Sequence, residues 1–119
     1  MLGKLKNAVG DSAIRSAINT YADRISQKLE EVTRLAPADV SDDARFRNKV
    51  IAPTLIVVVA SASGATKLIP NFDQRFDRAM LHVRDQLIIV DTANNKISLA
   101  PDYKSRVGDV LVEGFRQSA

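Results

Sequence analysis

Residues 54–60, with the sequence TLIVVVA, form the only run of the chain that is apolar on every side, and this run constrains the fold most. A segment without a polar face must be covered all round, so we expect the other elements to bury it. Its β-branched residues favour a strand covered on both faces. A buried helix beginning near Pro53 produces the same pattern, and this alternative stays open.

The N-terminal third carries an amphipathic stripe in which apolar residues recur three or four positions apart. The pattern predicts one helix over residues 12–35, about 36 Å long, which matches the diameter of roughly 35 Å of a compact domain of this size. Such a helix presents more apolar surface than one small body covers. We therefore expect a second copy of the chain to cover five side chains of the stripe: Ile14, Ile18, Tyr21, Ile25 and Leu29.

The remainder predicts shorter elements within a single domain, residues 1–119. Residues 36–43 are a connector in which Pro37 ends the first helix, and a shorter helix follows to about Ile51. Residues 71–85 have helical periodicity, 87–91 and 96–99 resemble a β-hairpin with an Asx-rich turn, and Pro101 begins a last helix.

These elements predict a helix-rich α+β fold. A small mixed sheet (54–60, 87–91, 96–99) is covered by helices, and its first two strands are parallel in a right-handed crossover. The alternative is a mainly α fold with one β-hairpin.

Composition narrows the functional classes. The chain has no cysteine and one histidine, so we expect no disulfide and no metal or other cofactor. A net charge of +3 spread along the chain and 5% aromatic residues do not indicate nucleic-acid binding. With no secretory signal, the expectation is a soluble cytoplasmic protein.

Two groups of residues could carry chemistry. If 54–60 is a strand, the loop at its carboxyl end could hold a phosphate or carboxylate through Ser61, Ser63, Gly64, Thr66 and Lys67. The spacing is not that of a nucleotide P-loop, and a small-residue connector explains the loop better. His82 could act as an acid or base oriented by Asp85, but no nucleophile stands beside it in the sequence, and a solvated helix flank explains it better.

The sequence thus favours a non-catalytic interaction protein that forms a homodimer through its N-terminal helix. The first alternative is a protein that binds a small anionic ligand at residues 61–67, with or without catalysis. The second is peripheral attachment to a membrane surface through residues 1–9, where Leu2, Leu5 and Val9 alternate with Lys4 and Lys6.

Overall fold

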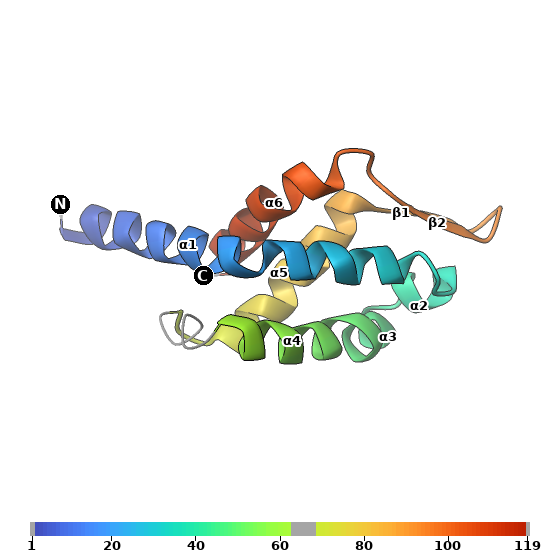
Figure 1. Ribbon diagram of the computed structural model, residues 1–119, viewed down its shortest axis with the longest axis horizontal. Helices are drawn as coiled ribbons and strands as arrows, with labels where there is room; N and C mark the ends of the chain where they lie inside the picture. Colours follow the sequence, from blue (N-terminus) through green and yellow to red (C-terminus); the bar gives the residue numbers. More distant parts are fainter. Residues whose placement is uncertain (1, 63–68, 119) are drawn as a thin grey trace.

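The computed structural model describes residues 2–62 and 69–118, and the side chains of 15–60 and 69–118 apart from 17 and 20. Its elements follow one another as α1 (Leu2–Val32), α2 (Pro37–Ser41), α3 (Asp43–Phe46), a π-helical turn (Arg47–Ile51), α4 (Ala52–Ala62), α5 (Phe72–Leu87), β1 (Ile88–Asp91), β2 (Lys96–Leu99) and α6 (Tyr103–Gln117) (Figure 1). The protein is therefore a helix-rich α+β fold, as the sequence predicts. Within residues 36–43, predicted as a connector, α2 forms a short helix.

The prediction that residues 54–60 form a strand is wrong, because these residues lie in α4. The sheet consists of β1 and β2 alone among the described residues, and they pair antiparallel with Ile88 opposite Leu99 and Asp91 opposite Lys96. The parallel crossover between 54–60 and 87–91 is therefore wrong as well. An apolar run without alternation does not distinguish a strand from a helix, and here the preceding helical turns continue into it.

Helical backbone continues from Asp43 to Ala62 through the π-helical turn. That turn ends two residues before Pro53, which has no N–H to donate to the carbonyl four residues earlier. A wider turn gives room for the proline ring, and the Ala52 N–H bonds instead to the Arg47 carbonyl, five residues back. One residue after the proline, the Thr54 hydroxyl donates to the Val50 carbonyl at 2.5 Å, which satisfies a buried polar side chain.

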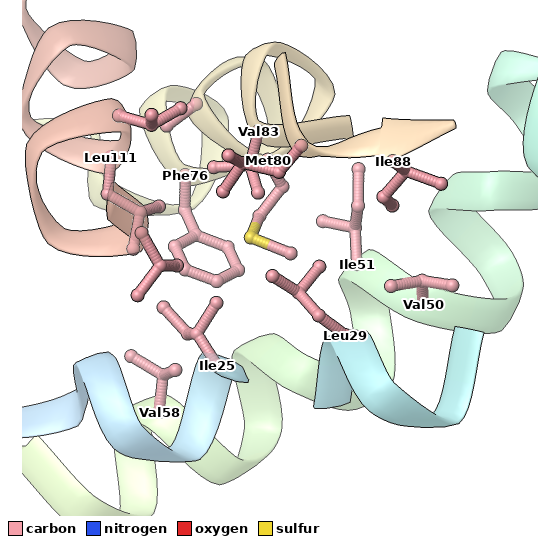
Figure 2. Close-up of a cluster of buried hydrophobic side chains, with 14 of the residues drawn as sticks. Ile25, Leu29, Val50, Ile51, Val58, Phe76, Met80, Val83, Ile88 and Leu111 are labelled. Carbon is pink, nitrogen blue, oxygen red and sulfur yellow. The ribbon is translucent and has the colours of Figure 1, made fainter. Parts of the chain in front are cut away.

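The helices form two layers around one core. α1 and α4 lie alongside each other, while α5 and α6 pack together and cross them (Figure 1). Figure 2 shows Ile25 and Leu29 of α1 and Val58 of α4 facing Phe76 and other buried side chains of α5 and α6. The apolar stripe of α1 therefore contributes one wall of the core of the monomer.

α1 is one unbroken helix that Gly10 does not interrupt. Its 31 residues span about 46 Å, and the whole protein measures 52 × 26 × 23 Å. The buried positions described on α1 begin at Ile18. Figure 1 shows that α4 and α6 end at the same end of the protein. The N-terminal turns of α1 extend beyond this end.

The β-hairpin extends from the opposite end of the protein (Figure 1). Its turn is closed by Asp91, whose carboxylate accepts from both the backbone and the side-chain amide of Asn94. Asn95 takes the left-handed backbone conformation, with φ of 52°, that such turns require. The hairpin predicted from the Asx-rich sequence is confirmed.

Among the described residues, no helix is long and apolar enough to cross a membrane.

Candidate functional site

The outer face of α4 exposes large apolar side chains. Ile56 is 71% exposed and Val59 is 45% exposed, although both belong to the most apolar helix of the described chain. Three further residues of the same face are exposed: Ala52, Pro53 and Ala60. Because every one of these five residues is apolar, the outer face of α4 offers water no hydrogen-bonding side chain.

The exposure follows from how narrowly the other helices cover α4. At about 100° per residue, Thr54 and Val58 are the two described side chains of α4 that point directly inward, and both are at most 1% exposed. Leu55 and Val57 lie half-buried on the two flanks. The opposite arc, around Ile56, has no helix above it among the described residues, and Pro53 at its edge lines a hollow beside the end of α1. Residues 54–60 were expected to be covered on all sides, but in the structure the other helices cover only the side that carries Thr54 and Val58.

The basic residues that precede α4 are held in ion pairs. Arg47 Nε lies 2.9 Å from an oxygen of Asp77, while Lys49 Nζ and Arg45 lie 3.0 Å and 3.9 Å from the carboxylate of Asp39. The hydrogen bond from Lys49 lowers the pKa of Asp39 below its usual range. Two carboxylates thus partly neutralise the three cations beside the outer face of α4, and the five exposed residues of the face carry no charge.

A hollow of about 140 Å³ lies between the end of α1 and the start of α4. Its walls include Val32, Leu35 and Pro53, and two lysines line it. Lys28 bonds to Glu31 at 3.4 Å and Lys49 bonds to Asp39 at 3.0 Å. Because both ammonium groups have carboxylate partners, the hollow does not form a cationic cradle for an anion.

The side chains predicted to meet a second copy lie in the core of the monomer instead. Ile18, Tyr21, Ile25 and Leu29 are all 0% exposed, and the side chain of Ile14 lies outside the described residues. The physical reason is that α4, α5 and α6 together cover the stripe from Ile18 to Val32. Contact with a partner through these four residues would require the core to open.

The loop predicted to bind an anion lies almost entirely outside the described residues, which leave out Ser63, Gly64, Thr66 and Lys67. Ser61 belongs to the last turn of α4, and its side chain is not among those described. The expected anion site depended on a strand that ends at this loop. Because the preceding element is a helix, that expectation loses its basis.

His82 lies in a groove between α5 and α6, whose other lining residues include Gln86, Arg106, Asp109 and Glu113. Asp85, expected to orient the imidazole, instead accepts a hydrogen bond from Arg84 Nε at 3.1 Å. The same guanidinium donates a second hydrogen bond, from Nη1 of Arg84 to Oδ1 of Asp43 at 2.7 Å, and it lies over the ring of Phe46. Among the described side chains, no three His, Asp or Glu residues are grouped as metal ligands would be.

Sequence reasoning missed the outer face of α4 because it treated residues 54–60 as a buried strand. Helical spacing would have shown that Ile56, Val59 and Ala60 share one side of the run, but an all-apolar segment contains no polar residue to indicate which side faces water.

Comparison of the chain with protein-family models, with curated proteins and with solved structures gives no match.

Proposed function

We propose that the protein is a non-catalytic interaction protein that self-associates into a homodimer through the outer face of α4. The observation that supports this most is the exposure of Ile56 and Val59, at 71% and 45%, on a face without a polar residue. Contiguous apolar surface on a small protein marks a place of contact with another molecule more often than scattered apolar residues do.

The size of this face indicates a weak, concentration-dependent dimer. α4 has 11 residues and is about 16 Å long, so its outer face is smaller than the roughly 800 Å² per partner of a standard interface. Covering Ile56 and Val59 contributes about 2–3 kcal/mol per chain before the entropy of association is subtracted. Over both chains this is about 4–6 kcal/mol, so we expect dissociation in the high micromolar to millimolar range.

The proposed contact differs in location from the one predicted by sequence. The stripe of α1 from Ile18 onward contributes to the core, so we place the homodimer contact on α4, while the N-terminal turns of α1 extend past the other elements (Figure 1). The cysteine-free chain fits a reducing compartment, in which a non-covalent dimer forms without disulfides.

The projection of α1 supports a second candidate function, peripheral attachment to a membrane through residues 1–9. In the sequence, Leu2, Leu5 and Val9 recur at helical spacing between lysines. Sedimentation with vesicles of anionic and of neutral lipid tests this, using Leu5→Glu beside the parent. Binding to anionic vesicles that Leu5→Glu abolishes supports attachment, and equal sedimentation of both chains contradicts it.

Self-association is tested by sedimentation velocity or light scattering over a wide concentration range, with Ile56→Glu compared to Ile89→Glu. Ile89 is a matched control, because it is 52% exposed but lies on β1, at the hairpin end of the protein. The parent is expected to approach the mass of two 13.0-kDa chains as concentration rises. Ile56→Glu should stay monomeric, because association would bury its charge, and Ile89→Glu should behave like the parent.

Both substituted residues are exposed, so unchanged circular dichroism and melting temperature should accompany the change in mass. A parent that stays monomeric at the highest concentrations reached would overturn the proposal. So would an Ile89→Glu variant that loses the dimer while Ile56→Glu keeps it.

A further inference from the structure

The outer face of α4 has the same pattern of side-chain size in both directions along the helix. Ile56 is flanked four residues away on each side by an alanine, Ala52 and Ala60, and three residues away by Pro53 and Val59. Residues spaced by four form one ridge of a helix and residues spaced by three form the other. Both ridges are therefore nearly symmetric about Ile56, and all five residues are exposed.

A face with this symmetry matches itself when a second copy is turned end for end. In a two-fold dimer the same patch is used by both chains, so a residue on the axis meets its own counterpart. Ile56 can occupy that place without repulsion because it is uncharged. The alanines at either end leave room for the partner's Ile56, so the two helix axes can lie within the usual range of about 8–10 Å.

The charges beside α4 favour the antiparallel orientation over the parallel one. Arg45 and Lys49 precede the amino end of α4, and their side chains are 59% and 50% exposed despite their ion pairs with Asp39. Parallel helices would bring these cations next to their own counterparts. Antiparallel helices bring them toward the carboxyl end of the partner's α4, where the helix dipole is negative and favours cations.

The same ion pairs favour a protein partner over a membrane surface for this face. A helix that lies on anionic lipid uses basic residues along its border to contact head groups. Here Arg45, Arg47 and Lys49 each have a carboxylate within 4.0 Å. Three cations facing two carboxylates leave a single net positive charge at this border, fewer than the row of unpaired basic residues that a lipid-binding helix presents.

We infer that the dimer forms by antiparallel packing of the two α4 helices, with the two-fold axis passing beside Ile56 and with Ala52 of one chain opposite Ala60 of the partner subunit. This inference rests on the proposed self-association and specifies its geometry. It also explains why the contact is short: the symmetric pattern extends four residues in each direction from Ile56 and then ends.

Disulfide trapping tests the geometry, because the parent chain has no cysteine and each introduced thiol is unique. Three single variants are prepared: Ala52→Cys, Ala60→Cys and Ile56→Cys. One partner of each mixture is labelled with ¹⁵N, so that mixed and like-with-like products are separated by mass. After mild oxidation, Ile56→Cys should link to itself, and a mixture of Ala52→Cys with Ala60→Cys should give the mixed product in several-fold excess over either like-with-like product.

The control is Ile89→Cys, an exposed position of the same residue type away from the face, which measures random collision. A dimer whose Ala52→Cys chains link mainly to each other would overturn the antiparallel geometry and leave self-association intact. Linking no greater than that of Ile89→Cys in every sample, together with a monomeric mass for the parent, would overturn both. A dimeric parent mass with no linking above this control would overturn the α4 contact.

Discussion

The two glycines of α6 provide the sharpest test of the packing, because the same substitution should change stability in opposite directions. Gly108 and Gly114 are both interior to the helix Tyr103–Gln117. A Cβ placed at Gly108 meets no atom within 4 Å beyond its own helical turn in the described part of the chain. A Cβ at Gly114 would lie 2.7 Å from the Cα and 3.1 Å from the carbonyl oxygen of Ala79 on α5.

These distances set the expected magnitudes. Replacing a helix-interior glycine by alanine gains about 0.5–1 kcal/mol of backbone entropy, so Gly108→Ala should raise the free energy of unfolding by that amount. Gly114→Ala has the same gain but forces α5 and α6 apart. Since the obstructing atoms are backbone atoms of a fully buried residue, overpacking of about 1–3 kcal/mol outweighs the gain. We expect Gly114→Ala to be destabilised by about 1–2 kcal/mol.

Urea unfolding followed by far-UV circular dichroism measures both changes against the parent, with the slopes compared to confirm that the unfolded state is unaltered. The two variants should differ by roughly 2 kcal/mol, with the parent between them. A Gly114→Ala variant as stable as Gly108→Ala would refute the close approach of α6 to α5, and with it the placement of the Phe72, Phe76 and Phe115 cluster that the approach allows.

Two further predictions concern polar groups. The hydroxyl of Tyr21 is buried without a hydrogen-bond partner among the described residues, so Tyr21→Phe should stabilise the fold by about 1 kcal/mol, and a loss of stability in thermal melting would contradict this. Hydrogen bonds from Lys49 and Arg84 lower the pKa of Asp39 and Asp43. The stabilisation that these carboxylates give is therefore complete above the ordinary aspartate pKa of about 3.9 and is lost as the pH falls through their lowered values. Melting temperatures recorded down to about pH 2 should fall most steeply below that value, and Asp43→Asn should show a shallower fall; an identical profile for this variant would contradict the assignment.

Local signals in the amino-acid sequence determined several elements on their own. The helix over 71–85, the hairpin with its Asx-rich turn and the helix after Pro101 all appear close to their predicted places. Periodicity, proline position and turn residues act within a few residues of backbone, so the sequence alone specifies them. The long first helix follows for the same reason, and it continues through Gly10 to Leu2.

Which side chains are buried depends on elements that are distant in the sequence. For this reason the sequence predicted burial less well than it predicted secondary structure. The stripe of Ile18, Ile25 and Leu29 has the same pattern whether a partner or α5 and α6 cover it, and only the tertiary structure shows that the monomer does. His82 and Asp85 are three residues apart, yet a competing arginine takes the carboxylate.

Residues 54–60 show this division most clearly. Their composition determined that they would be apolar and ordered, but a run without polar residues has no periodicity from which to infer its conformation or its exposed side. The turns from Asp43 onward made the run helical, and the position of α1 covered Thr54 and Val58 while leaving Ile56 in water. Because one helix can be covered from several directions at nearly equal cost in local energy, only the assembled protein decides which face remains for a partner.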